Sequence, residues 1–393
     1  DLHLCDRRQR QMCIRDRDIF HRFYPAYLDQ YSPSPVQAKV AHNIMNCKTG
    51  AYGANVCVCE DCGFVQIHYN SCRNRCCPMC QAVPKEMWMD ARREDVLDAP
   101  YFHLVFTVPD ILNPVIYSNQ RLLYDALYHA ASSTISELTA DPKHLGAKVG
   151  YICILHTWGS EMNFHPHIHT ILLGGGLASN NQWKDNGENF FLPIRVISKM
   201  FRGKYLEELK RLWEEDKLVF HGTAEKFRNH YTFKELLDSC YGMDWIPHCK
   251  KTFNGAQTVI KYLGKYTHRI AVSNHRIVRM DDDTVTFLVK DYRNEGQWKE
   301  LTISGVEFVR RFLMHVPPRR FVRIRHYGLL CSRTKSQKLT LCRNLLGCKK
   351  YLSKLRDMEM PEILEHLYGI KVCVCKACGG HLGKPQMRMP LRC

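Results

Sequence analysis

The sequence predicts an α+β protein, in which helices lie on an antiparallel sheet behind a small cysteine-rich module. From Tyr101 onward, segments with the alternation typical of strands are interleaved with segments of helical periodicity. Short-spaced cysteines gather ahead of them, between residues 57 and 80. This order fits an antiparallel sheet that carries helices, preceded by a module that a metal ion holds together.

The individual elements follow from local patterns. Residues 19–50 form an amphipathic helical segment, because Ile19, Phe20, Phe23 and Tyr27 recur at helical spacing. Alternation predicts strands over 102–107, 149–157, 190–196 and 276–279, followed by a hairpin of 284–290 with 298–303. Helical spacing predicts helices over 114–138 and 199–218.

The charge balance favours a polyanionic partner. The chain of 393 residues carries 56 Lys and Arg against 39 Asp and Glu, a net charge of +17, and nucleic acid is the usual partner of such an excess. A run of about twenty apolar residues, which a membrane helix needs, is missing from the sequence, so no membrane partner is expected.

The cysteine pattern and residues 1–18 give information on the cellular compartment of the protein. Twenty cysteines in short-spaced clusters favour metal binding over disulfides and predict a reducing cytoplasm. Residues 1–18 are Arg-rich, lack the apolar stretch of a secretory signal and resemble translated sequencing-adaptor sequence. We therefore expect this leader to be disordered and exclude it from the fold.

A candidate metal site lies in Phe164-His165-Pro166-His167-Ile168-His169. The stretch is predicted to be a strand that ends at the three glycines 174–176, so His167 and His169 point to the same face. His165 is in line with them if the strand starts early. Two imidazoles on one face can hold a divalent cation.

A pair of tyrosines follows about ninety residues later. Residues 257–269 have helical periodicity, and Tyr262 and Tyr266, four apart, would lie on one helix face. They either pack into the core or present two phenolic oxygens to one site. The neighbouring cations Lys261, Lys265 and Arg269 suit an anionic ligand and favour the second interpretation.

The cysteine cluster predicts a structural zinc site. Cys59/Cys62 and Cys77/Cys80 form two C-x-x-C pairs that fourteen residues separate, a spacing typical of tetrahedral zinc. Cys57, Cys72 and Cys76 are left over, so the identity of the four ligands stays open. Further cysteines at 373, 375 and 378 resemble half of another zinc knuckle, which only His381 or Cys393 is expected to complete.

Residues 305–335 form a cationic stretch with interleaved aromatics. The candidate DNA contacts in it are Arg319, Arg320, Arg323 and Arg325, and Phe321 and Tyr327 are candidates for base stacking. The alternative is a solvated helix face above core aromatics.

Together, the His-x-His strand and the Tyr-x-x-x-Tyr helix resemble the HUH endonucleases, in particular the two-tyrosine rolling-circle transposases of bacterial insertion sequences. Residues 101–107, 155–159, 262–275 and 325–329 are also similar to blocks of that family, and the resemblance covers roughly residues 35–350. It implies an HUH-type antiparallel sheet behind a zinc-ribbon-like module.

The resemblance also implies an activity. Mg²⁺ or Mn²⁺ on His167 and His169 would bind the scissile phosphate, with His165, His156 and Gln257 open as a third ligand. Tyr262 or Tyr266 would attack phosphorus and form a 5′-phosphotyrosine link to single-stranded DNA at the ends of the element and at its target. The family commonly has histidine where Cys76 stands, which makes Cys76 an alternative zinc ligand.

The expected organisation is a leader at 1–18, a helical and zinc-binding domain at 19–95 and a catalytic domain at 96–305. A basic DNA-binding extension at 306–350 and a tail at 351–393 complete it. Two other functions remain open, a rolling-circle replication initiator with the same chemistry and a non-catalytic zinc-ribbon DNA-binding protein. A hydrolytic metalloenzyme is not supported, because the sequence has no H-E-x-x-H motif.

Overall fold

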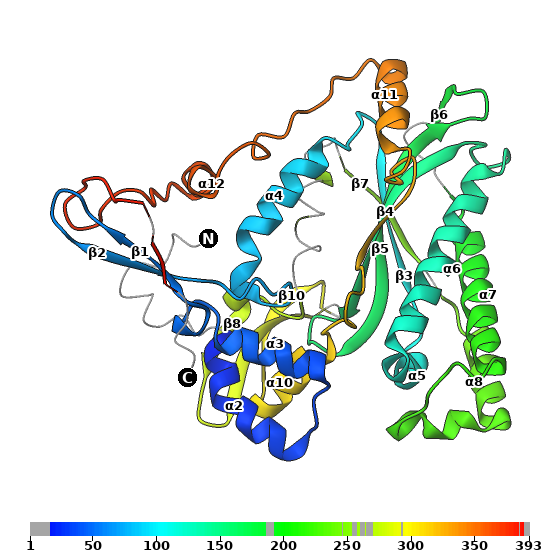
Figure 1. Cartoon of the computed structure of the whole chain (residues 1–393). Helices are drawn as coiled ribbons and strands as arrows, with labels where there is room; N and C mark the ends of the chain where they lie inside the picture. Colours follow the sequence, from blue (N-terminus) through cyan, green and yellow to red (C-terminus); the bar gives the residue numbers. More distant parts are fainter. Residues whose placement is uncertain are drawn as a thin grey trace.

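The architecture is a mixture of antiparallel sheets and helices, which confirms the predicted α+β class (Figure 1). A computed structural model describes residues 16–185, 192–245, 247–253, 258–259, 264, 270–291, 294–384 and 386–388. Within these ranges, no helix is both long and apolar enough to cross a membrane.

The central sheet has the strand order β11-β4-β5-β3-β7, with β6 paired to β5, and all its pairings are antiparallel. Its strands are β3 (Tyr101–Thr107), β4 (Lys148–Trp158), β5 (Phe164–Leu177), β6 (Trp183–Asp185), β7 (His248–Phe253) and β11 (Ile324–Gly328). The predicted strands over 102–107 and 149–157 are thus confirmed. The histidine strand is confirmed too, but its predicted end at the glycines 174–176 is wrong, because these glycines pair within the sheet and β5 continues to Leu177. The long strand β5, which carries the histidines, lies in the middle of the sheet.

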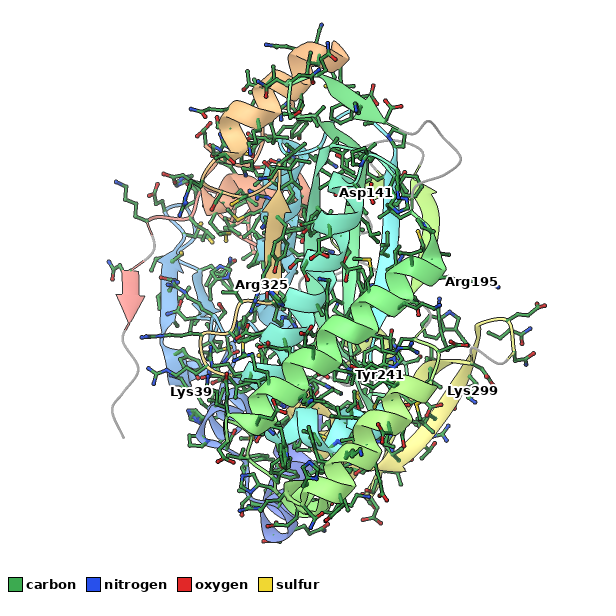
Figure 2. All side chains as sticks on the ribbon, turned by 90° about the vertical axis from the view of Figure 1, so that its right-hand side faces the viewer. Lys39, Asp141, Arg195, Tyr241, Lys299 and Arg325 are labelled. Carbon is green, nitrogen blue, oxygen red and sulfur yellow. The ribbon has the colours of Figure 1, made fainter. Side chains whose placement is uncertain are left out.

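Four helices cover one face of this sheet: α5 (Asn113–Ser118), α6 (Gln120–Ala140), α7 (Ile194–Glu214) and α8 (His230–Gly242). Figure 2 looks onto this side and shows α7 and α8 in front of the sheet. Leu104, Phe106 and Ile168 of the sheet share a core with Leu127 of α6 and Phe201 of α7. The strand predicted over 190–196 is wrong at 192–196, because α7 begins at Ile194, directly after its N-cap residue Pro193; residues 190 and 191 lie outside the described residues.

The opposite face of the sheet packs against α4 (Ala82–Arg93) and α11 (Lys335–Leu346), as Figure 1 shows. Ile152, Ile154 and Ile171 of the sheet form this second core. Val259 is buried in the same core. This face also carries the histidines.

A third core joins the start of the chain to a later segment. Helices α2 (Asp16–Gln30) and α3 (Pro35–Met45), in the region predicted to be helical, pack against α10 (Gly305–Met314) and the sheet β8 (Ile277–Met280), β9 (Thr284–Asp291) and β10 (Gln297–Ser304). The predicted hairpin of 284–290 with 298–303 is confirmed as β9 and β10. The packing crosses the expected domain boundaries at 95/96 and 305/306.

The expected leader needs one correction. Residues 1–15 lie outside the described residues, but 16–18 belong to α2 and are not disordered. Asp16 is buried, and its backbone N–H donates a hydrogen bond to Oδ1 of Asn274 at 3.2 Å. Burial raises the pKa of this carboxyl to about 7.

A small sheet projects from the body on the left of Figure 1. It consists of β1 (Ala54–Val58), β2 (Val65–Tyr69) and β12 (Gln386–Arg388), with β1 in the middle. The chain reaches β12 from α11 through a long connection that contains α12 (Met360–Tyr368). The hairpin β1–β2 near the start of the chain and the strand β12 near its end therefore form one sheet.

Candidate functional site

Three buried histidines converge at one end of the central strands. His156 on β4 lies directly opposite His167 on β5, and His169 follows two residues later on the same face of β5. One ring nitrogen from each histidine lies within 4.8 Å of the others. The Nε2 atoms of His167 and His169 are 3.0 Å apart. We call His156, His167 and His169 the histidine trio.

The trio suits a divalent cation. Two ligands in neighbouring octahedral positions, each about 2.1 Å from a metal, lie about 3.0 Å apart, which matches the distance between the two Nε2 atoms. The Nδ1–H of His167 donates to the carbonyl oxygen of His165 at 2.7 Å, which leaves Nε2 free for a metal. Burial lowers the pKa of His167 to about 4, so its ring is neutral at neutral pH, as a ligand must be.

Two of the three candidates for a third ligand, His156 and His165, are among the described residues, and of these two only His156 joins the trio. His165 instead pairs with Asp110, Nδ1 to Oδ1 at 3.1 Å. Gln257 lies outside the described residues. His156 was recognisable because an antiparallel neighbour of a histidine strand places a histidine directly across from it.

His103 on β3 forms a hydrogen bond with His169 of the trio. It was not identified from the sequence. Its Nε2 lies 2.9 Å from Nδ1 of His169, and the two rings stack 5.1 Å apart. Metal-bound histidines usually have such a partner, which fixes the ring and its tautomer. Strand alternation places His103 on the same face of β3 as Tyr101 and Val105, but it does not show that β3 pairs with the histidine strand β5.

Both tyrosines, with Lys261, Lys265 and Arg269, lie outside the described residues, as does His268. Residues around them are described. Val259 is buried in the core on the histidine face of the sheet. Gly264 is buried so tightly that an added Cβ would lie 1.9 Å from Sδ of Met89 on α4. Val259 thus packs on the same side of the sheet as the histidine trio, and Gly264 packs against α4, which covers that side.

The cysteines form two quartets in place of the single one expected. Cys77 and Cys80 join Cys47 and Cys72, while Cys59 and Cys62 join Cys375 and Cys378. The expected grouping of Cys59 and Cys62 with Cys77 and Cys80 is therefore wrong. The physical reason is that Cys59 and Cys62 lie in the turn between β1 and β2, and β2 then leads the chain away from this turn before Cys77 and Cys80.

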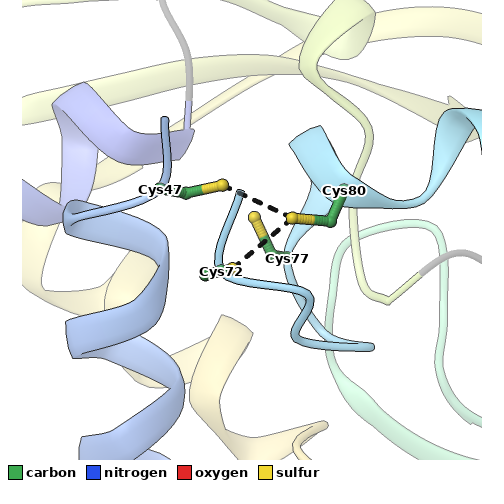
Figure 3. A group of neighbouring side chains, drawn as sticks. All are labelled: Cys47, Cys72, Cys77 and Cys80. Atoms are coloured by element: carbon green, nitrogen blue, oxygen red, sulfur yellow. Dashed lines mark hydrogen bonds between the residues drawn. The ribbon is translucent and has the colours of Figure 1, made fainter. Parts of the chain in front are cut away.

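Figure 3 shows the first quartet, Cys47, Cys72, Cys77 and Cys80. Sγ of Cys80 lies 3.4 Å from Sγ of Cys47 and 3.5 Å from Sγ of Cys72. Hydrogen bonding within the quartet, chiefly from Cys72, lowers the pKa of the Cys47 thiol to about 7. Cys76, the alternative ligand, is buried outside the quartet. Cys47 follows α3 without a C-x-x-C partner, so spacing alone did not identify it.

A cationic groove lies beside the first quartet. It is a cavity of about 420 Å³ lined by Lys39, Arg73, Arg75, Arg319 and Arg320, among others. These five side chains are exposed, and none of the described residues lining the groove is acidic. Arg73 and Arg75 lie on the loop between Cys72 and Cys77, so a metal on the quartet would hold one wall of the groove in place. Arg75 also donates to the carbonyl oxygen of Pro318 at 3.1 Å.

The candidate DNA contacts of the cationic stretch separate into two groups. Arg319 and Arg320 line the groove, whereas Arg325 pairs with Asp125 and lies 4.0 Å from the ring centre of Tyr128. Arg323 lies over Trp158, and burial lowers the pKa of its guanidinium.

The expected aromatic stacking is corrected. Phe321 is fully buried between Tyr124 and Tyr128, so its ring is not available to bases. Tyr327 is half-buried and stacks on Tyr151 at 5.1 Å. These rings fill the core, as the alternative interpretation of the stretch predicted.

Comparisons with known proteins give a consistent result. Residues 19–108 match a family described as transposase zinc-binding domain, and residues 150–338 match one described as putative transposase. The chain is 40% identical to the putative transposase y4qJ of Sinorhizobium fredii over 92% of both chains. It is 30% identical to the transposase for insertion sequence element IS801 of Pseudomonas savastanoi pv. phaseolicola, over 77% of this chain and 72% of that one. No solved structure matches.

Proposed function

The chain belongs to a family of insertion-sequence transposases that carry an N-terminal zinc-binding domain, and we propose that it cuts and rejoins single-stranded DNA at the ends of its element through a 5′-phosphotyrosine. The convergence of His156, His167 and His169 on one point carries this proposal. A transposase acts on DNA, and a bound divalent cation can stabilise the charge that develops when a phosphodiester is attacked.

The histidine trio would hold Mg²⁺ or Mn²⁺. Bound there, the cation would neutralise charge on the oxygens of the scissile phosphate. His103 would keep the ring of His169 in its binding orientation. The sheet contributes rigidity, because three of these four histidines are on the adjacent central strands β4 and β5 and the fourth is on β3, which pairs with β5.

Tyr262 and Tyr266 would supply the nucleophiles. One phenolic oxygen attacks phosphorus, the bond to the 3′ oxygen of the preceding nucleotide breaks, and the DNA leaves with a free 3′-hydroxyl. The phosphodiester energy stays in the protein–DNA bond, so rejoining needs no ATP. The positions of Val259 and Gly264 on the histidine face of the sheet support this arrangement.

Single-stranded DNA would bind along the cationic groove. Lys39, Arg73, Arg319 and Arg320 offer exposed charges for phosphates. The zinc ion that the first cysteine quartet would hold keeps the loop with Arg73 in place. Lys261, Lys265 and Arg269 are proposed as further contacts near the tyrosines.

The test is a covalent adduct. Protein is incubated with single-stranded oligonucleotides from the ends of its element and Mn²⁺, and adducts are separated by denaturing electrophoresis. Tyr262→Phe with Tyr266→Phe should abolish the adduct, while Tyr231→Phe, at an exposed tyrosine of α8, should not. An adduct formed by the double variant would refute the assigned nucleophiles. No adduct from the wild-type chain would favour a non-catalytic DNA-binding protein.

A further inference from the structure

The second cysteine quartet lies where the hairpin β1–β2 meets the C-terminal tail, a contact region that we call the junction. Cys59 and Cys62 come from the turn of the hairpin β1–β2, and Cys375 and Cys378 come from the tail. We infer that these four thiolates bind a second zinc ion, which fastens the C-terminal tail to the N-terminal hairpin. This metal site is independent of the proposed DNA cleavage.

The sulfur positions fit tetrahedral zinc. Sγ of Cys59 lies 3.5 Å from Sγ of Cys378, and Sγ of Cys62 lies 3.7 Å from Sγ of Cys375. All four sulfur atoms are within 4.8 Å of one another. Four sulfurs about 2.3 Å from one zinc are about 3.8 Å apart, whereas a disulfide needs about 2.05 Å.

The two C-x-x-C turns have the same backbone geometry. In the first, Cys59 N–H donates to Phe64 O at 2.9 Å and Gly63 N–H donates to Cys59 O at 3.0 Å. In the second, Cys375 N–H donates to Gly380 O at 2.8 Å and Gly379 N–H donates to Cys375 O at 2.9 Å. Gly63 and Gly379 both have positive φ, +70° and +79°. Two segments more than three hundred residues apart thus present their cysteines to each other in matching turns.

Backbone amides of the tail point at its sulfurs. Ala377 N–H lies 3.4 Å from Sγ of Cys375, and Gly380 N–H lies 3.4 Å from Sγ of Cys378. Such donors stabilise negative charge on sulfur, and zinc binds the thiolate form.

Few other contacts among the described residues hold the tail against the hairpin. The core of the junction consists of Cys57, Cys59, Cys375 and Leu382 alone. Backbone pairing adds a few bonds, including Gly383 N–H to Val58 O at 2.9 Å and Glu60 N–H to His381 O at 3.1 Å. So small a core does not normally fold without a metal or a disulfide. Structural zinc supplies the missing stabilisation.

The tail is also held before it reaches the quartet. Asp90 of α4 accepts hydrogen bonds from Tyr351 Oη at 2.6 Å, Ser353 Oγ at 2.6 Å and the N–H of Leu355 at 2.9 Å. The chain after Leu355 is thus anchored at α4, and the second zinc anchors its far end. Without that zinc, the part beyond α12 would have the weak pairing with β1 as its main attachment.

The test measures how many zinc ions the 393-residue chain binds. Cys375→Ser with Cys378→Ser should lower bound zinc by one atom per chain, and so should Cys59→Ser with Cys62→Ser. The quadruple variant should lose no more than either pair, because both pairs bind the same ion. Cys373→Ser is the matched control, since this exposed tail cysteine lies outside the quartet and its loss should leave the zinc content unchanged.

Limited proteolysis provides a second measurement. Loss of the ion should expose the tail, so trypsin should cut at Lys371 and Lys376 faster in the paired variants than in the control. Cys378→His, which retains four possible ligands, should keep the zinc and the protection, which separates metal loss from general misfolding. Unchanged zinc in both paired variants, additive loss in the quadruple variant, or a Cys59–Cys378 disulfide found by mass spectrometry would each overturn the inference.

Discussion

The hydrogen bond between His103 and His169 permits a sharp test of the metal site. Replacing His103 with Phe keeps a ring of similar size against His169, where the two rings now stack 5.1 Å apart at 10°. It removes both ring nitrogens, including Nε2, which lies 2.9 Å from Nδ1 of His169. The variant therefore leaves the trio intact and removes the group that orients one of its rings.

The expected effect is a loss of metal affinity. Removing the hydrogen-bond partner of a metal-bound histidine typically weakens metal binding about 10–100-fold, or about 1.4–2.7 kcal/mol. This exceeds the roughly 0.5–1.5 kcal/mol of an ordinary hydrogen bond, because the ring of His169 also loses its fixed orientation and tautomer. The Mn²⁺ concentration for half-maximal adduct formation should rise by that factor, and saturating Mn²⁺ should restore the rate.

His165→Phe is the matched control. His165 lies on the same strand, and its side chain bonds to the exposed Asp110. Its hydrogen bond with the trio is made by its backbone carbonyl oxygen, which the substitution retains. Its Mn²⁺ requirement should equal that of the wild type. The reasoning fails if His103→Phe binds Mn²⁺ as tightly as the wild type, measured by the electron paramagnetic resonance of free Mn²⁺. It also fails if saturating metal does not restore the rate.

Three further outcomes follow from packing and charge. Gly305→Ala should lower the free energy of unfolding by about 1–3 kcal/mol in denaturant titrations, because its Cβ would lie 2.2 Å from an aromatic ring of α2. Burial lowers the pKa of His315 to about 4, so below pH 6.5 the unfolded chain binds a proton that the folded chain does not. Stability should therefore fall by about 1.4 kcal/mol per pH unit down to about pH 4, and His315→Asn should remove that part of the slope. Arg319→Gln with Arg320→Gln should reduce the salt dependence of single-stranded DNA binding by about 1.4 in log–log slope, at about 0.7 per phosphate contact, whereas Arg325→Gln should not change it.

Much of the fold followed from periodicity. The strands around Phe102 and Ile152 and the helices of the N-terminal segment were recognisable because each buries one face at a regular spacing. The segment at 192–196 was mistaken for a strand, because a short apolar run does not distinguish a strand from the first turn of a helix. The packing of distant segments into one core was not predictable. Helices α2 and α10, for example, pack together although almost three hundred residues of sequence separate them.

The candidate site, like the fold, contains some residues that the sequence identified and others that it did not. His167 and His169 were identified from local alternation, because both are on one strand. His103 and the pairing of Cys59 with Cys378 depend on which strands and turns become neighbours, and a single sequence contains no direct record of such contacts. For a related reason, composition does not show that Arg325 already has Asp125 as a partner.

The described residues before and after the proposed nucleophiles are buried in two different cores. Val259 precedes the tyrosines and is buried against the histidine face of the central sheet, whereas Ile270 and Val272 follow them and are buried with α2 and α10. The distance between nucleophile and metal would then depend on how these two cores sit relative to each other. A substitution in the α2–α10 core, such as Gly305→Ala, should accordingly slow adduct formation while leaving the Mn²⁺ requirement unchanged, the opposite of the pattern expected for His103→Phe.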